Sequence, residues 1–235
     1  TLFTIGHTLT LFLSAYGLLF EMNRKNVQIV EFLIPLTIFI TGVVNILTAK
    51  KSSSGKENIR DNRIEWEHVL PASKMGSHLT CWGNERRQFP QCVKSNGKLK
   101  SGRDCCQKVN RDFRNAHNDL VNLTPAIGEV NADRSNLPYQ IISGEKRSYG
   151  QCDFEYDVAN KVVEPSEKVR GDIARIQLYL EDKYGEVLGF TFNNDKKLML
   201  EQWAESDPIS VWEIERNNRI CKAQGSGNNL INECE

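Results

Sequence analysis

Apolar residues dominate the first fifty positions of the chain, and polar and apolar residues are mixed in the rest. The stretch from Thr1 to Phe20 carries no formal charge, and Phe32 to Ala49 is a run of eighteen residues without one. A run of that length is close to the minimum that spans a bilayer. The polar stretch 51–62, which contains Ser52-Ser-Ser-Gly55, is typical of a linker. We therefore expect an apolar segment 1–50, a linker 51–62 and a folded domain 63–235.

The apolar segment has several interpretations. From Met22 it resembles a secretory signal, with a basic start, an apolar middle and Ala49 as a small residue for cleavage, although Glu31 and Pro35 interrupt it. A membrane anchor formed by residues 1–49, a pair of buried apolar helices and an incorrect upstream start are the alternatives. We expect an exported or membrane-associated protein rather than a cytosolic one.

Periodicity predicts few strands and several helices in the folded domain. Residues 63–70 alternate and are rich in strand formers, and Pro71 follows, so we expect a strand there. Residues 75–110, rich in Gly, Asn, Ser and Cys, resemble a long cross-linked loop. Residues 113–123 are ambiguous. Helices are expected at 125–131, 165–184, 198–203 and 208–220, with Gly225 after the last of these.

The helix expected at 165–184 has the clearest apolar face, formed by Val169, Ile173, Ile176 and Leu180 at helical spacing. We expect that face, together with Trp203 and Trp212, to pack in the core. The fold class is therefore α+β.

Seven cysteines lie between positions 81 and 234, without the spacing of a zinc finger. Disulfides in an oxidising compartment suit such a set. Cys221 and Cys234 flank a Gly/Asn-rich stretch and could close a short loop. Cys81 is a candidate partner for Cys105 or for Cys106.

Overall composition excludes a disordered tail, a collagen-like fibre and a polytopic transporter, because 40% of the 235 residues are hydrophobic and 26% are charged. The net charge is zero, which by itself argues against a nucleic-acid partner. However, residues 51–135 carry fifteen basic and ten acidic side chains, a net of +5, whereas residues 136–235 have a net of −6. A basic surface for nucleic acid is therefore compatible with the total, as is an ordinary solvated surface.

The strongest chemical signal is Glu65-Trp-Glu-His68. Adjacent residues on a strand point to opposite faces, but Glu67 and His68 can reach one cleft if the strand ends there. A lone histidine is more often a hydrogen-bonded core residue than a catalytic one, and that reading stays open at this point.

Two longer motifs resemble the bacterial endonuclease I family of non-specific nucleases, which have a ββα-metal (His-Me finger) site. They are Glu65-Trp-Glu-His-Val-Leu-Pro-Ala72 and Asn122-Leu-Thr-Pro-Ala-Ile-Gly-Glu-Val-Asn-Ala-Asp-Arg-Ser-Asn136. Tyr149-Gly-Gln-Cys152, Arg170-Gly-Asp-Ile-Ala-Arg175 and Trp212-Glu213 with Glu215-Arg216 match further along. The resemblance covers about three quarters of the chain and implies a ββα-metal core with additional helices and disulfide-bonded loops.

The resemblance implies a role for each matching position. His68 would be the general base, Glu67 and Asn131 would hold one divalent ion, by similarity Mg²⁺, and Arg103 would contact the cleaved phosphate. Glu129 and Arg134, beside Asn131, could orient the site, but ion pairs within their helix are the expectation. Val121 stands where the family commonly has a histidine, and the loop before Arg103 is longer than usual.

Chemistry supports these roles. A neutral imidazole can activate water near pH 7, and a hard cation with oxygen ligands stabilises the phosphate charge. An arginine fork suits phosphate, and none of these groups has to touch a base. We expect a monomeric, exported, metal-dependent endonuclease that cuts DNA and RNA without sequence preference. The alternatives are a membrane-tethered nucleic-acid-binding or uptake protein on the same fold, and a disulfide-stabilised interaction protein of the cell envelope.

Overall fold

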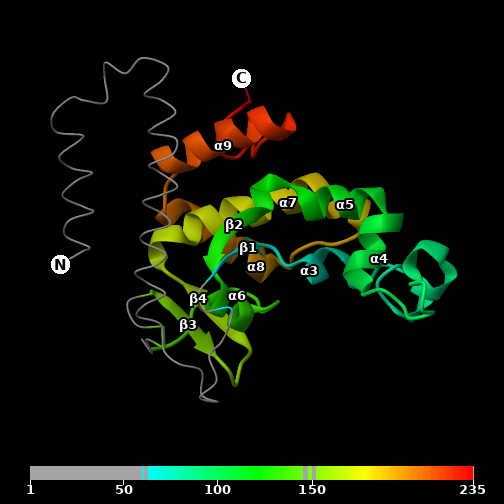
Figure 1. Ribbon diagram of the computed structural model, residues 1–235. Coiled ribbons are helices and arrows are strands. Elements are labelled where there is room, and N and C mark those ends of the chain that lie inside the picture. The colour runs from blue at the N-terminus through cyan, green and yellow to red at the C-terminus, as the bar shows by residue number, and fades with distance from the viewer. Residues whose placement is uncertain (1–59, 61–62, 145–147, 150–151, 235) are drawn as a thin grey trace.

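The computed structural model describes residue 60 and residues 63–144, 148–149 and 152–234 (Figure 1). The apolar segment 1–50 and nearly all of the linker 51–62 lie outside these residues, so the predictions made for them stay predictions. Within the described residues, no helix combines the length and apolar character that a membrane span requires.

A small antiparallel sheet and one helix form the part of the fold that positions the site. Strand β1 (Ile64–His68) pairs with β2 (Leu123–Ile127), and helix α6 (Gly128–Arg134) follows β2 directly and packs on both strands. The strand expected at 63–70 is confirmed, although it ends at His68. This β1–β2–α6 unit is the ββα arrangement that the resemblance implies.

Residues 125–127 were expected to begin a helix, and that prediction is wrong because they complete β2. Pro125 can occupy its position in β2 because of the way β2 pairs with β1. Val69 N–H donates to Asn122 O at 3.0 Å and Gly128 N–H to Arg63 O at 3.0 Å, so odd-numbered residues of β1 form the hydrogen-bonded pairs. Pro125 lies opposite Trp66, in a pair that exchanges no backbone hydrogen bonds, so its missing N–H costs nothing.

Helix α6 begins at a glycine because the chain is crowded where β2 ends. A Cβ atom on Gly128 would lie 2.4 Å from the carbonyl oxygen of Arg60 and 3.1 Å from Oε1 of Glu65. A side chain at this position would push the segment holding Arg60 away from the end of β1.

The segment expected to be a long loop, 75–110, contains helical structure, so that prediction is wrong for its last third. Helix α4 (Gly102–Val109) is capped by Ser101, whose Oγ accepts from Asp104 N–H at 3.1 Å. Cys105 and Cys106 on this helix are fully buried and belong to the hydrophobic core. Short helices precede it, namely α3 (Ala72–Gly76), η1 (Asn84–Gln88) and η2 (Pro90–Cys92).

Three disulfides close this region and the carboxyl end. Cys81 pairs with Cys106 and Cys92 with Cys105, so two bridges tie the segment 81–92 to α4. Of the two partners considered for Cys81, the structure has Cys106. The predicted bridge between Cys221 and Cys234 is confirmed.

Helix α7 (Arg170–Leu188) is the centre of the core, and it packs on α8 (Asn194–Ser206) and on α5 (Arg111–Asn118). Figure 1 shows it passing behind the β1–β2 pair. It begins five residues later than predicted because Pro165 ends strand β4 (Val162–Pro165). The predicted apolar face is buried except for Val169, which precedes the helix and is 39% exposed.

The remaining elements complete the α+β fold: η3 (Leu120–Asn122), β3 (Phe154–Asp157), η4 (Glu167–Val169) and α9 (Val211–Gln224). Strand β3 pairs with β4 in a second antiparallel sheet. Gly225 ends α9 with a left-handed φ of 77°, as predicted. Trp203 is buried in the core, but Trp212 is 54% exposed, so the prediction that it is a core residue is wrong. It lies in the first turn of α9, with the guanidinium of Arg216 5.8 Å from its ring centroid.

Candidate active site

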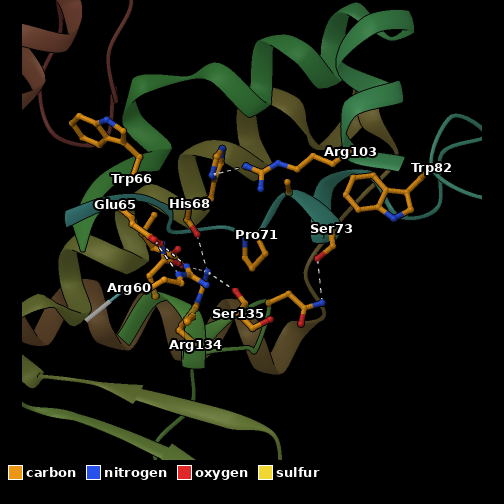
Figure 2. Close-up of a pocket in the computed structure, with 15 residues that line it drawn as sticks. Arg60, Glu65, Trp66, His68, Pro71, Ser73, Trp82, Arg103, Arg134 and Ser135 are labelled. Atoms are coloured by element: carbon orange, nitrogen blue, oxygen red, sulfur yellow. Dashed lines mark hydrogen bonds and ion pairs between the residues drawn. The ribbon is translucent and has the colours of Figure 1, made fainter. Parts of the chain in front are cut away.

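A pocket of about 550 Å³ opens where β1 ends, between α3, α4 and α6. Figure 2 shows the side chains that line it. The four residues to which the resemblance gives roles all line this pocket, although they come from three separate parts of the chain: Glu67, His68, Arg103 and Asn131.

The end of β1 explains how neighbouring residues serve one pocket. Glu67 and His68 would point to opposite faces of a longer strand, but the strand stops at His68 and the chain turns at Pro71. The Asn122 side chain fixes this turn, because its Oδ1 accepts from Leu70 N–H at 2.7 Å and its Nδ2 donates to Leu70 O at 3.0 Å. Asn122 is fully buried and does not line the pocket, so it supports the site only through its hydrogen bonds to Leu70.

Hydrogen bonds define the protonation state of His68. Its Nε2 lies 2.8 Å from the backbone oxygen of His117, which can only accept, so Nε2 carries the proton. Its Nδ1 lies 3.2 Å from Nη2 of Arg103, which can only donate, so Nδ1 presents a lone pair. Burial lowers the pKa of His68 to about 4, and the charges of Arg103 and Arg134 act in the same direction. His68 is therefore a neutral imidazole with a basic nitrogen facing the pocket.

His117 is a site residue that the sequence reasoning missed. The Nε of Arg103 donates to its Nε2 at 2.6 Å, and its Nδ1 donates to Asn118 Oδ1 at 2.9 Å. The rings of His117 and His68 lie 4.6 Å apart, and burial lowers the pKa of His117. The helical spacing of Phe113, Ala116 and His117, which form one buried face of α5, is the signal that would have found it.

Arg134 braces the end of β1 rather than pairing within its own helix, so the expectation of an ion pair within the helix is wrong for this residue. Its Nη1 forms an ion pair with Glu67 and donates to His68 O at 2.8 Å, and its Nη2 donates to Val69 O at 2.7 Å. The side chain is 3% exposed. One guanidinium therefore holds three consecutive residues of the site.

Glu65 sets the orientation of the Asn131 amide. Asn131 Nδ2 donates to Glu65 Oε2 at 2.9 Å, which leaves the amide oxygen directed elsewhere. Arg60 and Arg63 both form ion pairs with Glu65. The hydrogen bond from Arg60 holds the pKa of Glu65 at about 2, so this carboxylate stays an acceptor at every physiological pH.

The donors present suit a hard divalent ion. Glu67 uses one carboxylate oxygen for Arg134, and Asn131 uses its nitrogen for Glu65, which leaves one oxygen of each residue beside the pocket. Burial raises the pKa of Glu67, and a cation would oppose that shift. Among the described residues, no three His, Cys, Asp or Glu side chains gather as a metal site. Any ion held here would keep several water ligands, as Mg²⁺ commonly does.

Two further residues named by the sequence reasoning do not line the pocket. Glu129 lies in the first turn of α6, and the pocket includes Asn131 and Arg134 of that helix but not Glu129. Val121, at the position of the family's common histidine, is fully buried in η3 and packs in the core.

An antiparallel pair with a helix against it, and a histidine beside a carboxylate at the strand end, define the ββα-metal (His-Me finger) class of site. The sequence profile of the Endonuclease I family matches residues 25–235, and the chain belongs to that family.

Named relatives agree with this membership. The chain is 36% identical over 176 residues to Endonuclease-1 of Buchnera aphidicola subsp. Acyrthosiphon pisum, a match covering 75% of the chain and 62% of that protein. It is 38% identical over 177 residues to an extracellular deoxyribonuclease of Aeromonas hydrophila, covering 75% and 69%. A periplasmic deoxyribonuclease of that organism is 37% identical over 177 residues, covering 75% and 66%. The matched part thus spans about two thirds of each relative.

Proposed function

We propose that the chain is a metal-dependent endonuclease that hydrolyses phosphodiester bonds of DNA, and also of RNA, without sequence preference. The observation that carries the proposal is the convergence, in one pocket, of a neutral imidazole, two unused oxygen donors and an arginine fork. The names of the relatives, endonuclease and deoxyribonuclease, support it.

His68 would accept the proton of the attacking water at Nδ1. In the free protein Arg103 occupies this nitrogen. A phosphate in the pocket would compete for the Arg103 guanidinium, since the hydrogen bond from arginine to phosphate is charge-assisted and the one to a neutral imidazole is weaker. Binding of substrate would then expose Nδ1 to water at the moment when a base is needed.

Glu67 and Asn131 would hold one Mg²⁺ through their remaining oxygens. The bound ion would supply electrostatic stabilisation of the phosphate and of the leaving oxygen. Arg134 would keep Glu67 ionised and in place, and Glu65 would keep the amide oxygen of Asn131 turned toward the ion. Arg103 would neutralise charge on the phosphate after cleavage.

None of these groups is arranged to read a base, so affinity would come from phosphates and fall with salt. We further propose that the protein works outside the cytoplasm, in the periplasm or secreted, as a monomer. Three disulfides support that location because such bonds persist in oxidising compartments. The names of the Aeromonas relatives, an extracellular and a periplasmic deoxyribonuclease, support it as well.

Incubation of the purified, oxidised protein with plasmid DNA tests the proposal. We expect nicking and linearisation with Mg²⁺ and none with excess chelator, and the same dependence with a single-stranded RNA. Retention of DNA at low salt without cleavage in either condition would reject the nuclease and favour the nucleic-acid-binding alternative.

A further inference from the structure

A second cavity, of about 470 Å³, lies on the other side of Pro71 and Arg134 from the catalytic pocket. Those two residues line both spaces. The walls are also continuous along the chain, because Ser73 lines the first space and Lys74 the second, while Asn136 lines the first and Leu137 the second. The two spaces therefore share a wall formed by Pro71 and Arg134.

Lys196 gives the second cavity a positive charge. Its Nζ donates to the backbone oxygen of Tyr139 at 3.2 Å and lies 5.9 Å from the ring centroid of Trp203, and among the described residues no carboxylate forms an ion pair with it. Burial lowers its pKa to about 8, and the nearby charges of Arg134 and Lys74 act in the same direction. Asp195, the acidic residue in the lining, lies exposed in the first turn of α8. An anion would relieve the repulsion among these cations.

Gln177 gives the cavity a second polar side chain. It lies on α7, is 3% exposed and lines the cavity, and its side-chain amide forms no hydrogen bond with the residues described. Its amide atoms are not among the fully buried side-chain atoms that lack a partner in the described residues, so they open onto the cavity, where a ligand or solvent molecule can bond them. Lys196 and Gln177 come from helices packed on each other, so the core fixes their relative position.

We propose that this second cavity binds a phosphate group, with Lys196 and Gln177 as its principal ligands and Lys74 at its rim. Two sources share this chemistry: the phosphate next to the cleaved one on a nucleic-acid strand, and free phosphate. The first source rests on the function proposed above, whereas phosphate binding itself does not.

Thermal unfolding of the metal-free protein in chelator, with inorganic phosphate added at constant ionic strength, tests the site. A ligand that binds only the folded state raises the midpoint. We expect phosphate to raise the midpoint of the wild type, and Lys196→Met to weaken the apparent affinity about tenfold, the loss of one charged hydrogen bond. Gln177→Met, of nearly the same size, should also weaken it, and Lys196→Arg should retain it.

Two controls locate the effect. Lys222→Met removes an exposed lysine in the last turn of α9 and should respond as the wild type does. Arg103→Met removes the phosphate-binding group of the catalytic pocket and should also still respond. The proposal is overturned if the wild type does not respond, if Lys196→Met responds equally, or if Arg103→Met alone abolishes the response.

Cutting of a single-stranded oligonucleotide in Mg²⁺ separates the two sources. If the strand supplies the phosphate, Lys196→Met raises KM about tenfold and leaves kcat unchanged. An unchanged KM, together with a lost thermal response, assigns the cavity to free phosphate. If the wild type cuts nothing, the proposed function fails while the phosphate titration still decides the site.

Discussion

The guanidinium of Arg103 lies 3.2 Å from Nδ1 of His68, the nitrogen that would have to be free to take a proton from water. The Nε of the same guanidinium donates a hydrogen bond to Nε2 of His117 at 2.6 Å. The proposed base, His68, and the proposed phosphate ligand, Arg103, are therefore hydrogen-bonded to each other in the free protein. A bound phosphate would separate them.

This arrangement predicts the titration of His68 in metal-free protein. Because burial and the cations of Arg103 and Arg134 disfavour the imidazolium, the pKa of His68 should be about 4 rather than 6.5. Arg103→Met should raise this pKa toward the usual value. Proton NMR against pH in chelator, with the resonance assigned by its loss in His68→Ala, measures both. A wild-type pKa near 6.5 would show that the packing around His68 is not as described.

The linked effect on stability has a definite sign. The pKa of His68 is lower in the folded state than in the unfolded state, so protonation favours unfolding. The contribution of His68 to stability is complete above about pH 6.5 and is lost as the pH falls toward 4. The free energy of unfolding, measured in urea, should therefore decrease less between pH 7 and pH 4.5 for Arg103→Met than for the wild type.

His117 should act as a positioning residue through Arg103. His117→Leu removes the acceptor for Arg103 Nε and should lower kcat about tenfold, the worth of one hydrogen bond to a charged group. His117→Gln restores a side-chain acceptor and should recover most of kcat. The backbone oxygen that orients His68 remains in both variants. Equal kcat for His117→Leu and the wild type, in steady-state cutting of a labelled oligonucleotide, would remove His117 from the site.

Arg134 should matter for chemistry as well as for stability. Arg134→Met leaves Glu67 buried without its ion-pair partner, which should cost about 3–5 kcal/mol of stability. It should also weaken Mg²⁺ binding about 10–100-fold, as loss of a group that orients a metal ligand does. Urea unfolding and the Mg²⁺ dependence of cutting measure the two effects.

A buried pair far from the pocket provides the matched control. Arg175 donates to Glu213 from both Nε and Nη2 at 2.8 Å, and both side chains are at most 5% exposed. Arg175→Met should lose similar stability but keep its Mg²⁺ dependence, measured where both variants remain folded. If the two variants lose activity only in proportion to their unfolded fractions, Arg134 has a structural role alone.

Asp119 should make the stability of the fold depend on pH in the acid range. This buried carboxylate accepts from Tyr179 at 3.0 Å and from Tyr184 at 2.8 Å, and forms an ion pair with Lys183 at 3.0 Å. Hydrogen bonds from Gln224 and Val121 N–H help to hold the pKa of Asp119 below its usual value despite burial. Its contribution is therefore present above about pH 4 and lost as the pH falls through the folded pKa.

Asp119→Asn should cost about 2–4 kcal/mol at pH 7, because the new amide donors face the hydroxyls and the ammonium. The loss relative to wild type should shrink at pH 3. Asp182→Asn, at an exposed position on the same helix α7, is the control and should change stability little. Urea unfolding at the two pH values measures these differences in stability. An equal loss of stability at both would contradict the assignment of Asp119 as an ionised carboxylate.

The residues that the sequence motifs brought forward line one pocket, whereas the residues that support them were not found from the sequence. Taken alone, the Glu67-His68 pair was weak evidence, and the roles of Glu67, His68 and Asn131 were implied by the resemblance to the endonuclease I family. The partner of Arg134 could not be inferred from helical spacing, because Glu67 lies 67 positions earlier and approaches only when α6 packs on β1. An ion pair within the helix was the local interpretation, and tertiary packing overrode it.

The same limit applies to the helices. Cysteines, glycine and asparagine made 75–110 resemble a loop, yet Ser101 caps α4 and two disulfides stabilise it. Pro125 suggested the start of a helix, because a single sequence does not reveal that its register in β2 requires no N–H. His117 was overlooked because the helix that places it was not recognised in an ambiguous segment.

The proposed role of His68 as the base is the central claim, and cutting by His68→Ala tests it most directly. Single-turnover cleavage of a labelled duplex in Mg²⁺ should be at least about 100-fold slower than for the wild type, the lower range for loss of a general base. Binding of the same duplex in chelator should be unchanged. A variant that cuts at the wild-type rate would contradict the assignment.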